Sequence, residues 1–442
     1  DAVFGRDSLI VGLYLQELYP QLMQTTIMEL AQRQCRSNTD TYRNDGTIGK
    51  ILHEDRKEGD PIREGLEKSN NWKFPYYGTE DATPLYVKAI ASHVRFLGSE
   101  VGESFLDSIY EGQDKKEHTI RESLGLAVQY IKRKMDENPQ GLLEFKRTNS
   151  GGLGNQAWKD SWDSYFHADG TIANHENGIA SIEIQGYAYD ALVDTAELLP
   201  DQSWELHARA GNLKRQVFDT FWVDEQGGYF ALGTDRDEKG NLRAMKIKTS
   251  NMGHLLNSRL LDGNDLETTY KRDAVVRALF SDDMMSESGI RTLSSDEKTR
   301  FKPTAYHNGT VWPHDNYFIA QGLEHHQMYG LARYLYKKII HIHHVTGKYP
   351  ETVQGNGDME PKVNGNTVVI FSWRDQRKNC IEQVPQEVQA WAVAAVIASD
   401  EKMQTVPLHA EDLRIRPMEE SLLFALRKRR QEKRDLAMTK AA

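Results

Sequence analysis

The sequence of 442 residues has only two cysteines, Cys35 and Cys380, and no apolar run long enough to cross a lipid bilayer. Two cysteines cannot build the disulfide framework typical of small secreted domains. Positive charge is also in the minority, because 55 Lys and Arg residues face 65 Asp and Glu residues, a formal net charge of −10. These scarcities argue against nucleic acid or an anionic membrane as a partner, and they favour a reducing, cytoplasmic location.

Helical periodicity, by contrast, is abundant up to about residue 399. Apolar residues recur at helical spacing in eleven segments, which are approximately 9–18, 20–31, 81–96, 117–135, 179–199, 204–222, 251–261, 266–280, 309–323, 327–345 and 386–398. Asp7 or Ser8 is a suitable N-cap for the first. Four long connections interrupt the series, at 45–78, 140–178, 281–307 and 346–385. This pattern predicts an all-α architecture with function on the loops at one end.

Other structure is expected in three places. Residues 228–249 have the pattern of a β-hairpin, and 367–371 that of a single strand. The composition changes near residue 400, which divides a main domain of 1–399 from a charged helical tail of 400–442. The sequence begins at Asp1 without Met, so we expect the main domain to continue upstream of it.

Two carboxylates, Asp160 and Asp163, lie between Trp158 and Trp162 in the second long connection. A sugar has a polar rim and apolar faces, so carboxylates beside aromatic planes suit a site that cleaves sugars. A carboxyl group against an indole also has a raised pKa, because desolvation disfavours the charged form. The alternative is a surface loop that the two tryptophans anchor to the core, and these residues alone do not decide between the two interpretations.

Further polar and aromatic clusters stand at helix starts or in the long connections, and each could equally be a cap, an ion pair or a packed loop. They are Arg6 with Asp7, Tyr77 with Asp81, His307 with Trp312, and Glu351 after Pro350.

The histidine pairs invite a metal interpretation, which the spacing does not support. On a helix His341 and His344 share one face while His343 points elsewhere, and no neighbouring cysteine or carboxylate completes a ligand set there or at 325–326. We therefore expect neither a metal site nor a cofactor.

Taken together and in this order, the clusters resemble the glucosidase half of glycogen-debranching enzymes, the bacterial amylo-α-1,6-glucosidase-like proteins. These belong with glucoamylases and trehalases among the six-hairpin glycosidases. The resemblance extends over about residues 4–399, and its matching segments are 4–10, 45–46, 53–54, 77–82, 155–161, 183–185, 250–256, 289–293, 306–313, 350–351 and 389–391.

The resemblance implies an (α/α)6 barrel of six inner and six outer helices, with the site in a funnel at one end. The eleven predicted helices fit if the first helix lies upstream of Asp1. It also implies an inverting, exo-acting α-glucosidase that releases glucose from α-1,6 branch stubs or short α-glucans, without a cofactor. Such an enzyme needs one protonated carboxyl group and one carboxylate that activates water.

The resemblance also implies roles for individual residues. The Trp-x-Asp pattern makes Asp160 the general acid, and the Pro-Glu pattern makes Glu351 the general base. Trehalase-like members carry the acid in a Gly-Trp-Asp motif, which would select Asp163 instead. The predicted substrate-binding residues are Arg6 and Asp7 for outer hydroxyls, Tyr77 and Trp312 for stacking, His254 and His307 as polar groups, and Asp81, Trp158 and Asp163 beside them.

Two alternatives stay open. Linkage preference depends on pocket shape, so a trehalase or another small-glycoside hydrolase fits the same motifs. A non-catalytic glucan-binding protein or an inactive fragment is also possible if the barrel does not close.

Overall fold

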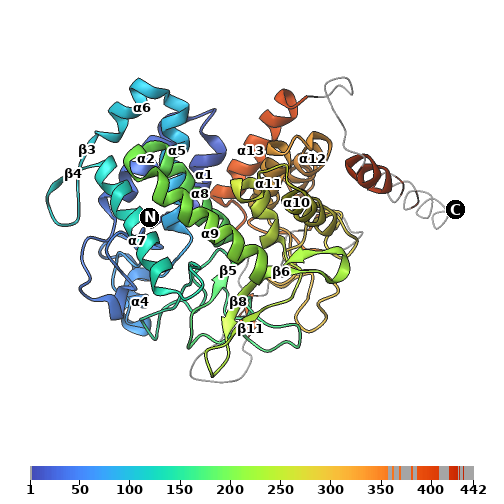
Figure 1. The fold of residues 1–442 in the computed structure, drawn as a ribbon. Helices are drawn as coiled ribbons and strands as arrows, with labels where there is room; N and C mark the ends of the chain where they lie inside the picture. The colour runs from blue at the N-terminus through green and yellow to red at the C-terminus, as the bar shows by residue number, and fades with distance from the viewer. Residues whose placement is uncertain are drawn as a thin grey trace.

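The computed structural model describes residues 2–356, 361–362, 368–369, 380–381, 386–407, 418–426, 428 and 432 (Figure 1). Six helices form a closed inner ring, in which each contacts the next and the last contacts the first. They are α1 (Gly5–Leu15), α5 (Ala82–Leu97), α8 (Ile182–Leu198), the 3₁₀ helix η3 (Ser250–Asn257), α11 (Pro313–His325) and α13 (Ala390–Thr405).

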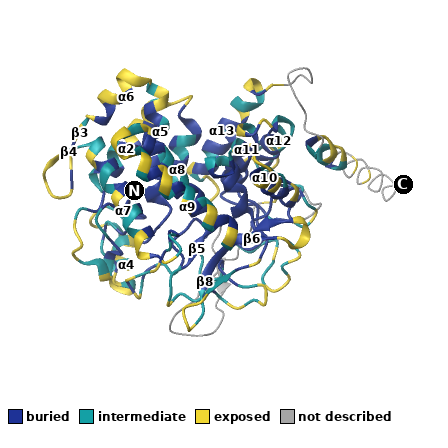
Figure 2. Cartoon of the chain, viewed as in Figure 1, coloured by how far each residue is buried: buried dark blue, intermediate teal, exposed yellow. Residues whose placement is uncertain are grey.

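Five helices in the described chain pack around this ring. They are α2 (Pro20–Gln32), α7 (Ile120–Glu137), α9 (Ser203–Phe221), α10 (Leu266–Leu279) and α12 (Tyr329–Thr346). α7 shows the reason for the two layers, because its buried residues recur at Ile120, Leu124, Val128 and Ile131, which is one helical face. α5 is instead buried around most of its surface. Burial therefore increases from the outer helices to the inner ring (Figure 2).

The predicted (α/α)6 barrel is thus confirmed, and one continuous apolar core joins the two layers. Connections hold shorter helices: α3 (Thr41–Asn44), α4 (Pro61–Asn70), α6 (Ser99–Leu106), η1 (Pro200–Gln202), η2 (Glu225–Gly227) and η4 (Arg259–Leu261). Antiparallel strand pairs lie between them. They are β1 (Ala2–Phe4) with β2 (Glu54–Arg56), β3 (Ile109–Glu111) with β4 (Glu117–Thr119), β6 (Trp222–Val223) with β7 (Tyr229–Phe230), and β10 (Val368–Val369) with β11 (Cys380–Ile381).

The predicted hairpin exists, but its strands are displaced. β8 (Gly233–Arg236) pairs with β9 (Leu242–Ala244) and also with β5 (Ala180–Ser181), whereas Tyr229 and Phe230 pair back onto β6. The strand expected at 367–371 is present at 368–369, and its other residues lie outside the described part of the chain.

Two predictions about helices need correction. The segment 251–261 is not an α-helix but the two 3₁₀ helices η3 and η4. Neither Asp7 nor Ser8 is the N-cap of α1, because the helix begins at Gly5. α13 continues to Thr405, past the predicted domain boundary at 399, and the division into barrel and tail stays a prediction.

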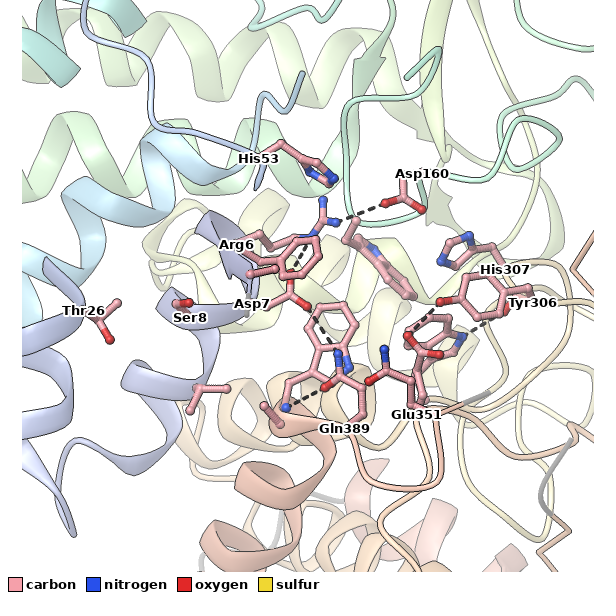
Figure 3. A pocket seen from close by; sticks show the side chains of 18 of the residues that line it. Arg6, Asp7, Ser8, Thr26, His53, Asp160, Tyr306, His307, Glu351 and Gln389 are labelled. Carbon is pink, nitrogen blue, oxygen red and sulfur yellow. Dashed lines mark hydrogen bonds and ion pairs between the residues drawn. The ribbon is translucent and has the colours of Figure 1, made fainter. Parts of the chain in front are cut away.

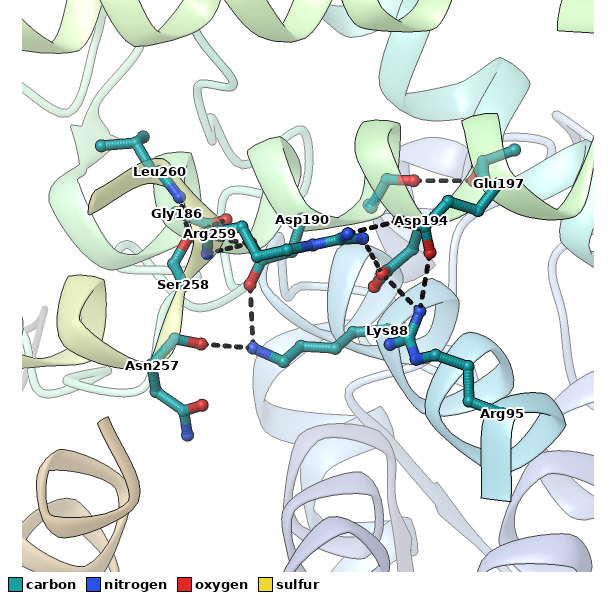
Figure 4. Close-up of polar contacts among 12 residues, drawn as sticks. Lys88, Arg95, Gly186, Asp190, Asp194, Glu197, Asn257, Ser258, Arg259 and Leu260 are labelled. Carbon is teal, nitrogen blue, oxygen red and sulfur yellow. Dashed lines mark hydrogen bonds and ion pairs between the residues drawn. The ribbon is translucent and has the colours of Figure 1, made fainter. Parts of the chain in front are cut away.

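The inner helices start at one end of the ring, where the long connections gather, and a network of ion pairs joins them near the other end (Figure 4). There Lys88 and Arg95 of α5 reach Asp190 and Asp194 of α8 at 2.8 Å each. Arg259 of η4 also pairs with Asp194. These contacts fix α5, α8 and the η3–η4 segment against one another. No described helix is long and apolar enough to span a membrane.

Candidate active site

A cavity of about 510 Å³ opens where the inner helices begin (Figure 3). Its size is typical of a site for a small ligand. The first turn of α1 contributes Arg6 and Asp7, and Gln389 is the N-cap of α13. Asp160 and Glu351 come from the second and fourth long connections. His53, the 306–312 segment, and Leu22 and Thr26 of α2 complete the lining, so widely separated parts of the sequence meet at this cavity.

Arg6 connects three carboxylates at one side of this cavity. Its guanidinium lies 3.0 Å from the Asp81 carboxylate, 3.3 Å from Asp160 and 3.9 Å from Asp7. Burial alone would lower the pKa of Arg6, but these carboxylates raise it above its usual range. The guanidinium therefore stays charged and holds the three carboxylates in fixed positions.

Asp160 faces the cavity with 30% of its side chain exposed. Burial raises its pKa to about 6, the nearby charges of Asp7 and Asp81 act in the same direction, and Arg6 opposes them. A carboxyl group with such a pKa holds a proton for part of the time near neutral pH, as a general acid must.

The residue next to it anchors the loop. Lys159 is buried, and its ammonium group donates to the main-chain oxygen of Thr292 at 2.5 Å. This bond ties the second connection to the third at the position where Asp160 enters the cavity.

Glu351 approaches the cavity from another side (Figure 3). The hydroxyl of Tyr306 donates to its Oε1 at 2.8 Å. Burial raises the pKa of Glu351 to about 7, and the Tyr306 hydrogen bond limits the rise because it favours the charged form. Asp160 and Glu351 thus both have raised pKa values in one cavity, which is the setting that acid–base hydrolysis requires.

Aromatic side chains form another wall. Trp158 meets Trp312 edge to face, with ring centroids 5.6 Å apart, and the His307 ring stacks on Trp312 at 5.0 Å. The main-chain amide and the hydroxyl of Ser161 lie 3.4 Å and 2.7 Å from Nδ1 of His307 and hold the ring in place. Burial lowers the pKa of His307 well below its usual range, so the ring remains uncharged at neutral pH.

Seven of the eleven predicted site residues line this cavity. They are Arg6, Asp7, Trp158, Asp160, His307, Trp312 and Glu351.

The other four, Asp81, Tyr77, Asp163 and His254, lie outside its lining. Asp81 is buried behind Arg6. Tyr77 points into the core, where its hydroxyl donates to the Arg33 carbonyl at 2.8 Å. The main-chain oxygen of Asp163 accepts a hydrogen bond from the side-chain amide of Asn308. His254 is buried and forms hydrogen bonds with Tyr187 and Asp315.

Tyr306, Gln389, Trp391 and His53 line the cavity and were not among the predicted site residues. Gln389 donates to Asp7 at 3.4 Å and so joins the two helices α1 and α13 across the cavity. All four residues belong to segments that carry the family resemblance, at 53–54, 306–313 and 389–391, and this membership was the sequence signal that could have identified them.

An (α/α)6 barrel with two carboxyl groups and an aromatic wall at the start of its inner helices defines a glycoside hydrolase of the six-hairpin type. The profile of the mannosylglycerate hydrolase MGH1-like glycoside hydrolase domain matches residues 28–353, well over half of the chain. The protein belongs to this family, and its substrate is a carbohydrate.

Solved structures agree with this assignment at the level of the fold. The chain is similar to the GH63 mannosylglycerate hydrolase from Thermus thermophilus in complex with glucose, with 12% identity, a TM-score of 0.56, and 90% of this chain and 92% of that chain covered. The complex of that enzyme with Tris gives 12% identity, a TM-score of 0.57, and coverage of 89% and 92%. No curated protein matches the sequence.

Proposed function

We propose that the protein is an inverting, exo-acting α-glucosidase that releases glucose from α-1,6 branch stubs or short α-glucans in the cytoplasm. The observation that carries this proposal is the meeting of Asp160 and Glu351 in one cavity from connections 191 residues apart in sequence. Figure 3 shows them on different sides of the cavity, with His307 and Tyr306 between them in this view. An inverting hydrolase needs its two carboxyl groups far enough apart for a water molecule to fit between the base and the sugar.

In the proposed reaction Asp160 donates its proton to the glycosidic oxygen, while Glu351 removes a proton from the attacking water. Loss of the leaving group and attack of water then occur on opposite faces of the sugar, so the anomeric configuration inverts. Tyr306 supports the base role, because its hydroxyl stabilises the ionised Glu351.

Exo-action is supported by the polar group at the start of α1. Arg6, Asp7 and Gln389 present donors and acceptors close together, as the hydroxyls of a terminal sugar require. Trp158 and Trp312 border the cavity, but they are only 2% and 1% exposed, so they contribute apolar edges to its wall.

The family match makes hydrolysis of a small glycoside such as mannosylglycerate the second candidate. Its glycerate carboxylate would need a cationic partner. Among the described lining residues Arg6 is the one Lys or Arg, and it already faces Asp7, Asp81 and Asp160. This charge balance favours an uncharged substrate.

The activity test compares release of free monosaccharide from a branched limit dextrin, isomaltose, maltose, trehalose and mannosylglycerate. We expect the dextrin and isomaltose to give the highest kcat/KM and the first product detected by proton NMR to be β-glucose. Preferred cleavage of mannosylglycerate or trehalose would replace the proposed specificity, and α-glucose as first product would exclude inversion.

The roles of the carboxyl groups are tested by Asp160→Asn and Glu351→Gln, each of which should lower kcat on isomaltose about 1000-fold. α-Glucosyl fluoride needs little acid assistance, so Asp160→Asn should recover much of its activity on that substrate and Glu351→Gln should not. Asp163→Asn is the matched control for the alternative acid and should stay within about tenfold of wild type. A larger loss in Asp163→Asn than in Asp160→Asn would reverse the assignment.

A further inference from the structure

Three metal-binding side chains converge at the far end of α11 from the cavity. His325 is the last residue of α11, His326 is its C-cap, and Asp262 is the C-cap of η4. Nε2 of His325 lies 2.7 Å from Oδ1 of Asp262. One ligand atom from each of the three residues lies within 4.8 Å of the other two. The carboxylate beside His325 thus comes from Asp262, 63 positions earlier, whereas the adjacent Glu324 pairs with Tyr336 and Lys402.

One of the three residues is buried and the other two are partly exposed, so the site is anchored in the protein and open to solvent. His326 is 7% exposed, whereas the side chains of His325 and Asp262 are 45% and 38% exposed. Zinc binds imidazole nitrogen and carboxylate oxygen at about 2.0–2.2 Å and favours four ligands. The exposed side chains can adjust their rotamers around an ion, and water can complete the coordination.

Among the described residues, the Lys and Arg side chains near the Asp262 carboxylate pair with other groups. Arg259 pairs with Asp194 and Glu197, and Lys88 donates to Asp190 at 2.8 Å and to the Asn257 carbonyl at 2.6 Å (Figure 4). Lys214 reaches only the main-chain oxygen of Asp262, at 3.3 Å. The Asp262 carboxylate therefore faces the two histidines.

We propose that Asp262, His325 and His326 bind one divalent transition-metal ion of the zinc class. Imidazole with carboxylate suits Zn²⁺ better than Ca²⁺ or Mg²⁺, which prefer sites made entirely of oxygen. The ion links the end of inner helix α11 to the η4 turn that precedes outer helix α10. The site lies about 20 Å along α11 from Trp312 at the cavity, so the ion stabilises the barrel and takes no part in hydrolysis.

The test is a titration of the chelator-treated full chain with ZnCl₂ at pH 8, followed by calorimetry and thermal unfolding. We expect one zinc per chain with a Kd of about 1–10 µM, and a Tm raised by about 3 °C at a hundredfold excess over Kd. Asp262→Asn, His325→Gln and His326→Gln should each weaken binding at least tenfold. Hydrolysis by the treated wild type should be the same with and without zinc.

His344→Gln is the matched control, since His344 is an exposed histidine of α12 near His341 and His343. It should leave both the affinity and the shift in Tm unchanged. Wild-type affinity in Asp262→Asn, or an equal loss in His344→Gln, would overturn the site. Binding of Ca²⁺ as tight as that of Zn²⁺ would overturn the class of ion. Asp262→Asn keeps the test valid if the buried His326 variant does not fold.

Discussion

At the scale of single residues, Tyr306 has the contact with the most direct consequence for the proposed reaction. Its hydroxyl hydrogen bond favours the ionised form of Glu351. Tyr306→Phe should raise the pKa of Glu351, the higher of the two values in the pair, so the alkaline limb of the pH profile of kcat/KM should move upward by about half a unit to one unit. Tyr229→Phe, which removes a hydroxyl outside the cavity lining, should leave that limb in place.

The wild-type pH profile follows from the same pair of carboxyl groups. Burial raises the pKa of Asp160 to about 6 and that of Glu351 to about 7. Because the two groups interact, the two apparent values belong to the pair, and one proton must remain on it for catalysis. The profile of kcat/KM should therefore be bell-shaped with its maximum between about pH 6 and 7. Activity that stays constant from pH 5 to 9 would contradict this description of the site.

Sequence reasoning found both carboxyl groups but could not place every neighbour. Asp160 and Glu351 belong to short patterns that the family resemblance identifies. Tyr77 was expected to stack on sugar, yet its ring belongs to the core. A local pattern does not show which face of a connection turns inward, because this depends on contacts with segments far away in the sequence.

At the scale of helices, alanine substitutions at two glycines test how closely the inner helices α11 and η3 pack. A Cβ on Gly322 of α11 would lie 2.5 Å from the Leu256 carbonyl carbon of η3, whereas a Cβ on Gly211 of α9 would have no neighbour within 4 Å. Gly322→Ala should lower the free energy of unfolding by about 2 kcal/mol through overpacking. Gly211→Ala should raise it by about 1 kcal/mol through helix propensity. Urea unfolding of both variants measures this difference, and equal effects would mean that α11 and η3 are not in close contact.

Helices with strong apolar periodicity were predictable within a few residues, and α7 is an example. α4 was missed because its segment is polar and has no buried residue, although Asp60 followed by Pro61 is a recognisable helix start. η3 was assigned as α-helix because the spacing of apolar residues does not distinguish a 3₁₀ helix of eight residues from an α-helix.

At the scale of the whole molecule, the ionised Glu351 buried at the cavity should lower the free energy of unfolding above neutral pH. The pKa of Glu351 is about 7 in the folded chain against an ordinary value of 4.5. A raised pKa stabilises the folded state below pH 4.5, and this contribution is lost as the pH rises through 7. Glu351→Gln should therefore be more stable than wild type at pH 8, by on the order of 2 kcal/mol, and about equal to it at pH 4.5. Urea unfolding at the two pH values would refute this if the difference were the same at both.

The hydrogen bond between Asp7 and Gln389 lies where the first and last helices of the inner ring meet. During synthesis, Arg6, Asp81 and Asp160 leave the ribosome long before Glu351, and the wall that Gln389 and α13 supply comes later still. In the proposed mechanism, a growing chain therefore carries Asp160 for about ten seconds or more without Glu351, the group that would activate water. By this proposal, hydrolysis would begin only once α13 has emerged and docked against α1, so a partly synthesised chain would not act on glycosides in its surroundings.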